Sequence, residues 1–384
     1  MTAPMHDAGP VAAVHQFVAS FTARDAVSRH AQLLQRTFRA LGLDSEIYAD
    51  RIGRGLGRQA RPYLSYAPEG PAAQRVHIYH LATGSPVADT VSHRPEKLVV
   101  NYHNLTPAKY FVGWDDAMVA ELERGERQAR RLAARADATI ADSTFNAEEF
   151  AALGASPVAV VPVLADRMTT EATGQIRPVH RDLGVRTRRA RWLFVGRLTP
   201  NKAQDRLVRA LAVAIARYDD QASLDLVGGP SPASYGAYVR QVAKSHKVAG
   251  RVRIHGSIGH TELANLYLLA DVFVSASQHE GFGIPLVEAM ATGLPVVATD
   301  AGAVAETVGD AGLMLPDDDP ETLAAAVHTL STNPEAVHAM RLRGFDRVTN
   351  LDWRKSRVEF VKRMIEMGTL PAGFGPRVEA LSSR

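Results

Sequence analysis

Short apolar runs alternate with longer segments of helical periodicity through the N-terminal half of the chain. The segment 27–41 carries apolar residues at helical spacing, and Gly42 follows it as a stop signal. Strand-like runs lie on both sides of this segment, at 11–18, 45–49, 76–81, 98–102, 138–141 and 158–161. Buried strands that alternate with helices are typical of a parallel sheet with crossover helices, so this half is predicted to be a doubly wound α/β domain.

The C-terminal half repeats this alternation. Helices are predicted to begin near Ala203 and to cover 285–292 and 352–367. For the second of these, Pro285 suits the first helical position and Gly293 suits a left-handed end. Strand-like runs lie at 192–195, 224–227, 252–255, 272–275 and 295–299.

The segment 166–191 separates the two halves. It is polar, rich in arginine and short of periodic apolar residues, as expected of a linker. A chain of 384 residues also exceeds what one hydrophobic core usually supports. We therefore predict two domains. The first covers 1–170 and is joined by the C-terminal segment 352–384, and the second covers 171–351.

Composition narrows the class of protein. The formal net charge of +3 does not indicate a nucleic-acid partner, and the lack of cysteine excludes disulfides and thiolate metal sites. The first ten residues have no apolar core of a signal peptide, and no apolar run approaches the roughly 20 residues that span a bilayer. We therefore expect a cytoplasmic protein, with peripheral attachment to the inner face of the membrane left open.

Two carboxylates lie near the helix predicted at 285–292. Glu280 follows the strand at 272–275, and Glu288 is expected in the first turn of the helix. Ligands of parallel sheets bind beyond the carboxyl ends of the strands, and the N–H groups at a helix start form an anion site. Backbone N–H groups can bind the phosphates of a nucleotide sugar, and carboxylates can accept from its hydroxyls, so this site suits a nucleotide sugar. The structural alternative is a solvated Glu280 and a Glu288 that only complements the helix dipole.

Two cations follow the strand at 192–195. After Gly196 come Arg197 and, five residues later, Lys202, just before a predicted helix. A planar guanidinium and a compact ammonium together suit two adjacent phosphate groups. The alternative is two exposed basic residues in a turn. The segment is not a Walker loop, because the residue directly before Lys202 is not glycine and the residue directly after it is not serine or threonine.

These motifs resemble those of a known family. The sequence from Glu280 to Glu288, EGFGIPLVE, is similar to the E-x7-E signature of the family 4 retaining glycosyltransferases, and the similarity continues to Glu306. Gly196 to Lys202 is similar to the G-R-x4-K pattern of the same family. The resemblance implies the GT-B fold, with two Rossmann-like domains facing across a deep cleft. It also implies transfer of a hexosyl group from a UDP- or GDP-sugar to a sugar-containing or other hydroxyl acceptor, without a metal or a cofactor.

The resemblance also assigns roles to individual residues. Arg197 and Lys202 would hold the donor pyrophosphate, and His103 would contact the transferred sugar. Glu280 would orient the sugar hydroxyls and Glu288 would bind the ribose. The remaining donor contacts would come from the backbone at Ile254, which holds the base, and from Gly281, Phe282, Gly283, Ile284 and Leu286 around the helix start.

The N-terminal half departs from the family at one loop. Members carry a glycine-rich turn between the first strand and the first helix, whereas the segment 20–28 has no glycine. Asp25 in this segment is a candidate acceptor contact, although an N-cap of the helix is the favoured interpretation. For His103 the alternative is a structural histidine. Capping is likewise favoured for Ser143 or Thr144 after the strand at 138–141, with a contact to the donor as the minor alternative.

Three interpretations stay open at the level of sequence. The arginine-rich helix predicted at 115–136 suits either anionic lipid or, as its interspersed glutamates favour, a face of surface ion pairs. Asp317 to Asp319 resembles a metal-binding triplet, but helix capping explains it better. The rival functions are a GT-B sugar phosphorylase, a nucleotide-sugar epimerase, and a nucleotide-sugar binding protein without catalysis.

Overall fold

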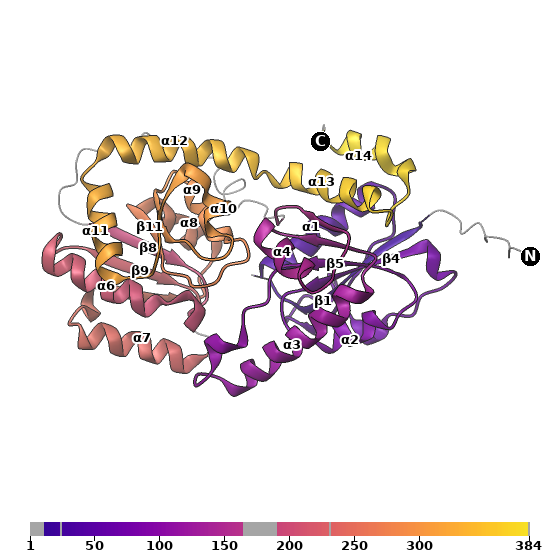
Figure 1. Cartoon of the computed structure of the whole chain (residues 1–384), viewed down its shortest axis with the longest axis horizontal. Helices are drawn as coiled ribbons and strands as arrows, with labels where there is room; N and C mark the ends of the chain where they lie inside the picture. Colours follow the sequence, from indigo (N-terminus) through magenta and orange to yellow (C-terminus); the bar gives the residue numbers. More distant parts are fainter. Residues whose placement is uncertain (1–10, 24, 164–189, 230–231, 383–384) are drawn as a thin grey trace, which may run out of the picture. The chain divides into compact units, whose positions relative to one another are not determined.

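The computed structural model describes residues 11–23, 25–163, 190–229 and 232–382. The chain divides into two compact units, which are described separately (Figure 1). Unit 1 comprises Met1–Ala108, Ala117–Asp166 and Asp352–Arg384, and unit 2 comprises Lys109–Asp116 and Arg167–Leu351. The domain boundary predicted between residues 170 and 171 lies outside the described residues.

Unit 1 is built on a parallel sheet of seven strands. Their order across the sheet is β3-β2-β1-β4-β5-β6-β7, and each neighbouring pair is parallel. The strands are β1 (Ala13–Phe21), β2 (Ile47–Ile52), β3 (Arg61–Pro62), β4 (Arg75–Leu81), β5 (Lys97–Tyr102), β6 (Ala138–Ala141) and β7 (Val158–Val160). The strand order reverses between β1 and β4, so the loops after these strands leave in opposite directions.

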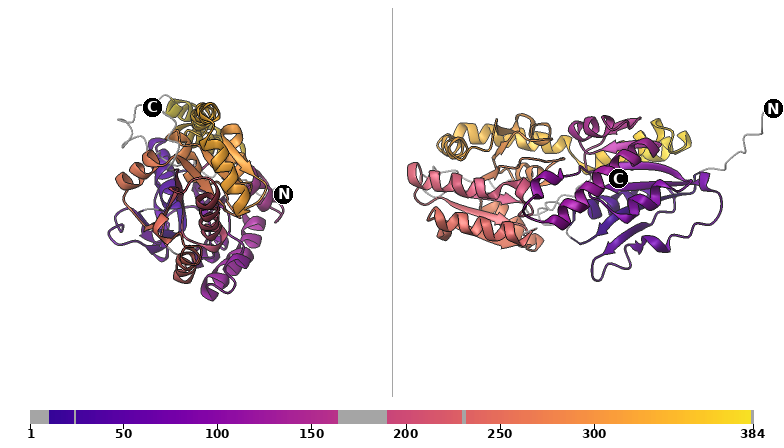
Figure 2. Two further views of the ribbon diagram at one scale, coloured as in Figure 1. Left: turned by 90° about the vertical axis from the view of Figure 1, so that its left-hand side faces the viewer. Right: turned by 60° about the horizontal axis from the view of Figure 1, so that its bottom comes forward.

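Helices cover both faces of this sheet. On one face, side chains of α1 (Ala26–Ala40), α13 (Trp353–Glu366) and α14 (Gly375–Ser382) pack on the strands. On the other face lie α2 (Pro86–Ser92), α3 (Asp116–Arg135) and α4 (Thr144–Ala151). The C-terminal helices, drawn in yellow, therefore share a core with β1 and α1 (Figures 1 and 2). This agrees with the prediction that the C-terminal segment packs on the N-terminal sheet.

Unit 2 is built on a second parallel sheet, of six strands. Their order is β10-β9-β8-β11-β12-β13. The strands are β8 (Arg191–Val195), β9 (Ser223–Val227), β10 (Val252–Gly256), β11 (Val272–Ser275), β12 (Val296–Thr299) and β13 (Gly312–Leu315). Here the order reverses between β8 and β11.

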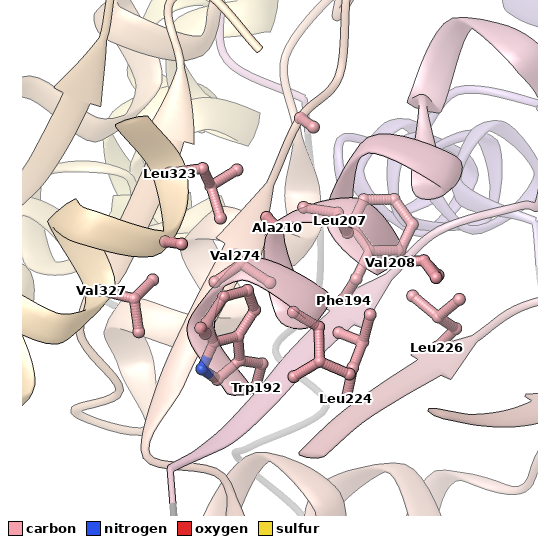
Figure 3. Packing of buried hydrophobic residues seen from close by; sticks show 14 of the residues in the cluster. Trp192, Phe194, Leu207, Val208, Ala210, Leu224, Leu226, Val274, Leu323 and Val327 are labelled. Carbon is pink, nitrogen blue, oxygen red and sulfur yellow. The ribbon is translucent and has the colours of Figure 1, made fainter. Parts of the chain in front are cut away.

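The core of unit 2 lies on both faces of its sheet. On one face, Trp192 and Phe194 of β8 pack against Leu207 and neighbouring apolar residues (Figure 3). The helices on this face are α6 (Gln204–Arg217), α7 (Ala233–Ser245) and α11 (Pro320–Ser331). The opposite face is covered by α8 (His260–Leu269), α9 (Ile284–Ala291), α10 (Val304–Val308) and part of α12 (Pro334–Asn350).

One segment of the N-terminal half packs on unit 2. The Trp114 ring lies 5.2 Å from the Tyr235 ring and 5.3 Å from the Tyr238 ring, both on α7. The Tyr110 hydroxyl donates to the Gln278 carbonyl at 3.0 Å. This segment lies within the range 1–170 that the sequence predicts for the first domain. Its local sequence pattern does not show that its aromatic residues pack on α7.

Most predicted strands and helices agree with the structure to within about two residues. Strand β1 extends to Phe21 and α1 begins at Ala26, so the loop predicted at 20–28 is shorter than expected. Strand β13 was not predicted, because its four residues are too short to show a period and only its neighbours in the sheet identify it.

Candidate functional site

Two predicted motifs lie at the carboxyl ends of neighbouring strands in unit 2, where the strand order reverses. Strands β8 and β11 are neighbours, and their loops leave the carboxyl ends at the point where the sheet reverses. Ligands of doubly wound sheets bind at such a point. Arg197 and Lys202 lie on the loop after β8, and Glu280 lies on the loop after β11. The fold therefore brings the two motifs together.

The main chain of the loop after β8 is fixed by hydrogen bonds, while the side chain of Arg197 on this loop is exposed. Leu198 N donates to the Gly229 carbonyl at 3.0 Å. The Gln204 amide donates to the Arg197 carbonyl at 2.8 Å. The Arg197 side chain itself is exposed. This arrangement suits a guanidinium that is presented to a ligand by a fixed backbone.

Lys202 forms an ion pair with Glu280. Their Nζ and Oε1 atoms lie 2.6 Å apart, and the two side chains are 20% and 17% exposed. The Ser277 hydroxyl donates to the same Glu280 oxygen at 3.1 Å, and the lysine also reaches the His279 carbonyl at 3.4 Å. The cation predicted to bind the diphosphate and the acid predicted to bind the sugar therefore touch each other.

The loop from Glu280 to Gly283 is clamped by the segment after β12. Ala303 N donates to the Glu280 carbonyl at 2.9 Å, and the Thr307 hydroxyl donates to the Phe282 carbonyl at 2.5 Å. A Cβ on Gly302 would lie 2.3 Å from the Glu280 carbonyl oxygen, so only glycine allows this approach.

Helix α9 begins with a backbone that favours glycine. Its N-cap, Gly283, has φ of 87°, and glycine offers no side chain to accept from the first N–H groups. Pro285 has no N–H group and Leu286 N donates to the Gly283 carbonyl at 2.9 Å, so the candidate N–H donor of this turn is Ile284, four residues after Glu280. The helix start can therefore receive an anion, as the sequence predicted for the region from Gly281 to Leu286.

Glu288 lies deeper in α9 than predicted. The helix begins at Ile284, one residue earlier than predicted, and has no acidic residue in its first turn, so the prediction that Glu288 lies in that turn was wrong by one residue. The Tyr267 hydroxyl donates to Glu288 Oε2 at 2.8 Å. Burial, and then the charge of Glu288, raise the pKa of Tyr267 well above its usual value. Tyr267 therefore keeps its proton and orients one carboxylate oxygen.

Ile254 lies in β10, the edge strand of the sheet in unit 2. The flanking side chains, Arg253 and His255, both bind Asp225 of β9, at 2.6 and 2.7 Å. Burial opposes ionisation of Asp225, but the hydrogen bonds from these two groups outweigh it and lower the pKa of Asp225. The side chains of Arg253 and His255 therefore attach β10 to β9 through Asp225. The backbone of Ile254 remains the candidate contact to a base.

In unit 1, His103 follows β5 and is almost fully buried, with 4% of its side chain exposed. Its Nδ1 lies 2.7 Å from Asp142 Oδ2, and its Nε2 lies 2.9 Å from His80 Nδ1. Sequence reasoning singled out His103 but missed His80. The signal for His80 was present as a polar residue inside the apolar run 76–81.

The capping interpretations are confirmed. Asp25 Oδ2 accepts from Ser28 N at 2.9 Å at the start of α1, and Ser143 Oγ accepts from Asn146 N at 3.1 Å at the start of α4. Asp319 Oδ2 accepts from Thr322 N at 2.8 Å at the start of α11. The contact of Asp25 with an acceptor stays a prediction.

Three arginines of α3 form surface ion pairs, and their partners are aspartates outside the helix, not its interspersed glutamates. Arg124 and Arg131 both contact Asp89 of α2, and Arg135 contacts Asp137 at 3.1 Å. These pairs agree with the interpretation that the helix presents a face of ion pairs. Among the described residues, no helix is both long enough and apolar enough to cross a membrane.

One group of side chains among the described residues has the spacing of a metal site. Ring nitrogens of His30, His80 and His103 lie within 4.8 Å of one another in unit 1. The sequence predicts that the protein needs no metal, and this stays a prediction.

Comparisons with known proteins point to one family. Residues 189–333 match the family model described as "Glycosyl transferases group 1". The chain is 30% identical over 329 residues to a D-inositol 3-phosphate glycosyltransferase of Kineococcus radiotolerans, which covers 79% of this chain and 74% of that protein. It is 35% identical over 211 residues to D-inositol 3-phosphate glycosyltransferase 2 of Catenulispora acidiphila, which covers 52% of this chain and 49% of that protein. The chain thus spans from half to three quarters of the length of these relatives.

Solved structures show the same fold. Sucrose-phosphate synthase from Thermosynechococcus elongatus matches with a TM-score of 0.69 and 20% identity, over 92% of this chain and 99% of that chain. Anabaena Alr3699/HepE in complex with UDP-glucose matches with a TM-score of 0.67 and 16% identity, over 92% of this chain and 99% of that chain. The predicted pair of Rossmann-like parallel sheets, the GT-B fold class, is confirmed.

Proposed function

Because the chain belongs to the group 1 glycosyl transferases, we propose that it transfers a hexosyl group from a UDP- or GDP-sugar to a hydroxyl acceptor with retention at the anomeric carbon. One observation carries this proposal. The Lys202–Glu280 ion pair lies where the strand order of the sheet in unit 2 reverses, and Glu280 precedes the first residue of α9 by four residues, with no side-chain cap on that helix start. A cation, a carboxylate and an N–H donor at a helix start are what a sugar diphosphate requires.

The donor would bind through its diphosphate. Arg197 is exposed and can form two parallel hydrogen bonds to phosphate oxygens, while Lys202 acts as a compact charge. The Ile284 N–H group at the start of α9 would bind a further oxygen. As negative charge grows on the leaving diphosphate, these fixed groups stabilise it without further reorganisation.

The nucleoside would bind through carboxylate and backbone groups. Glu288 would accept from the ribose hydroxyls, with one of its oxygens held by Tyr267. The Ile254 backbone would contact the base at the edge of the sheet. The solved structure of Alr3699/HepE in complex with UDP-glucose supports testing a UDP-sugar first.

The transferred sugar would be oriented by Glu280 and the backbone from Gly281 to Gly283, which the clamp by Ala303 and Thr307 holds in place. His103 is proposed to contact the transferred sugar as well. The acceptor's proton would pass to an oxygen of the donor phosphate as the bond to the anomeric carbon forms. No nucleophile from the protein is then needed, and no residue of the site has to change its covalent state.

A panel of nucleotide sugars tests the donor. UDP-, GDP- and ADP-sugars are added to the full chain and the thermal midpoint is recorded, since a ligand that binds the folded state raises it by mass action. We expect one class to raise the midpoint in the wild type and to fail in Lys202→Ala. If no nucleotide sugar shifts the wild type, the proposed donor class is wrong.

The rival activities are separated by the products. With donor alone, an epimerase converts the nucleotide sugar, whereas a transferase shows at most slow hydrolysis. A phosphorylase releases a sugar phosphate when inorganic phosphate is the acceptor. Mass spectrometry of the products of these two incubations distinguishes an epimerase, a phosphorylase and a transferase. A protein that only binds the donor gives no product in either incubation, and none when a hydroxyl acceptor is added.

A further inference from the structure

A short segment of the N-terminal half belongs to unit 2. Residues Lys109–Asp116, here called the strap, lie in the chain between two segments of unit 1. Near the end of the strap, the Trp114 ring packs on two tyrosine rings of α7. The Ser234 hydroxyl of the same helix donates to the Trp114 carbonyl at 3.2 Å. The strap is therefore attached to α7 through both the ring and the main chain of Trp114.

Near the start of the strap, Tyr110 contacts the loop after β11. Its hydroxyl donates to the Gln278 carbonyl at 3.0 Å, and its ring lies 6.1 Å from the His279 ring. The Lys109 ammonium lies 5.3 Å from the centre of the Tyr110 ring. Gln278 and His279 directly precede Glu280 in the chain. Tyr110 therefore contacts the segment that carries the acid of the candidate site.

Three parts of unit 2 hold Gln278. Its main-chain N donates to the Asn201 carbonyl at 2.8 Å, on the loop after β8. Its side-chain amide donates to Asp318 Oδ2 at 2.7 Å, in the turn before α11. The Tyr110 hydroxyl supplies the third contact, to the carbonyl. The residue two places before Glu280 is thus fixed by two loops of the sheet and by the strap.

These contacts lie directly beside the ion pair of the candidate site. Asn201 precedes Lys202 in the chain, so the hydrogen bond from Gln278 joins the residue before the lysine to the residue two places before Glu280. The charged atoms of the pair lie 2.6 Å apart. We propose that Tyr110 is a positioning residue of the donor site, which acts through the Gln278 main chain to fix Glu280 relative to Lys202.

The hydroxyl of Tyr110 should matter more for position than for stability. Gln278 is exposed, so water can replace the tyrosine as the donor to its carbonyl. A water molecule satisfies the acceptor but does not restrain the main chain to one place. A displacement of about 1 Å at a reacting group can lower a rate by about a hundredfold. Loss of the hydroxyl should therefore change turnover while the fold persists.

The contacts of the nucleoside diphosphate should not depend on Tyr110. The main chain at Arg197 is fixed by Gly229 and Gln204, and Glu288 is oriented by Tyr267. The effect of Tyr110 on turnover rests on the proposed function, in which Glu280 orients the sugar hydroxyls. Loss of Tyr110 should consequently lower kcat and leave nucleoside diphosphate binding unchanged.

Hydrogen–deuterium exchange of the full chain without any ligand tests the contact itself. Tyr110→Phe keeps the ring and removes the hydroxyl, so we expect faster exchange in peptides that cover 276–283, which contain the Gln278 amide. Tyr218→Phe is the matched control, because its ring stacks on His328 of the same unit at 4.5 Å, and it should exchange like the wild type. Equal exchange of these peptides in the wild type and Tyr110→Phe would refute the contact.

Turnover tests the positioning role. We expect Tyr110→Phe to lower kcat by about tenfold, with the affinity for UDP or GDP in titration calorimetry unchanged. Trp114→Ala frees the other end of the strap and should give the same pattern, with partial recovery in Trp114→Phe, which keeps a ring beside α7. Wild-type kcat in a folded Tyr110→Phe would overturn the role, as would weaker nucleotide binding with kcat unchanged.

A double-mutant cycle with Glu280→Gln shows whether Tyr110 acts through Glu280. If it does, adding Tyr110→Phe to Glu280→Gln should change turnover little, because the positioned group is already lost. Losses that simply multiply would contradict this route. The exchange experiment needs no donor, so it can succeed when the donor panel fails, and the reverse. Failure of the proposed function and failure of this inference are therefore distinguished.

Discussion

Lys202 Nζ and Glu280 Oε1 lie 2.6 Å apart, at the point where the strand order of the sheet in unit 2 reverses. Each residue was predicted to bind a different part of one donor molecule. In the structure they hold each other in place, with their charges compensated. A donor that binds here has to bring its diphosphate to the lysine while its sugar hydroxyls approach the glutamate.

We predict that Lys202→Ala and Arg197→Ala each lower kcat/KM by about a hundredfold or more, because each removes a fixed positive charge from the leaving diphosphate. Lys244→Ala, at an exposed position on α7, is the matched control and should keep wild-type turnover. Unchanged turnover in both Arg197→Ala and Lys202→Ala would refute the diphosphate site.

Glu280→Gln should separate binding from transfer. Removing the carboxylate frees Lys202 from its partner and removes a negative charge from beside the diphosphate, so UDP or GDP should bind at least as tightly as to the wild type. Turnover should fall by about tenfold or more, because the sugar hydroxyls lose their acceptor. Titration calorimetry and product formation measure the two effects. Weaker nucleotide binding with full turnover would show that Glu280 does not act on the sugar.

Glu288→Gln should weaken nucleoside diphosphate binding by about tenfold or more, since a hydrogen bond to a charged group contributes about 1.5–3 kcal/mol. Tyr267→Phe removes the hydroxyl that holds Glu288 Oε2 at 2.8 Å and should give a smaller loss in the same direction. Tyr238→Phe is the control, because its hydroxyl contacts Arg209 instead. Unaltered affinity of Glu288→Gln in titration calorimetry would count against the ribose role.

Unit 1 should lose stability in mild acid through His77. The side chain of His77 is 1% exposed. Burial lowers the pKa of His77 to about 3, although the nearby Glu96 opposes this shift. In the unfolded chain the pKa of a histidine is about 6.5. Between these values the unfolded state binds the additional proton. The contribution of His77 to the free energy of unfolding is therefore complete above pH 6.5 and falls as the pH falls, by at most about 1.4 kcal/mol per pH unit.

Urea unfolding at several pH values between about 6.5 and 4 measures this slope. His77→Gln keeps a hydrogen-bonding group beside Tyr66 but cannot titrate, so its stability should depend less steeply on pH than that of the wild type. His93→Gln, an exposed histidine of the same unit, should keep the wild-type slope. Parallel slopes for wild type and His77→Gln would contradict the assignment.

What the sequence could predict were features that a single segment encodes. The strand before Arg197, the glycine-bounded helix after Glu280 and the caps at Asp25 and Asp319 all follow from short-range rules, and the structure contains them. The helix start was misjudged by one residue, which places Glu288 just after the first turn, because the start depends on the conformation of Gly283, which the sequence suggests only indirectly.

Contacts between segments could not be predicted in the same way. The His80–His103 pair requires β4 and β5 to be neighbours in a register that pairs His80 with Asn101. The Lys202–Glu280 pair requires β8 to lie beside β11. Strand neighbours are set by packing of the whole sheet, so the residues of each pair are visible in the sequence while their contact is not.

The most direct test of the central claim is a crystal structure of the full chain with a bound nucleoside diphosphate. We predict that the diphosphate lies on unit 2, within hydrogen-bond distance of Arg197, Lys202 and the N–H group that opens α9, with Glu288 at the ribose. A well-ordered nucleotide bound elsewhere, with the Lys202–Glu280 pair untouched, would contradict it.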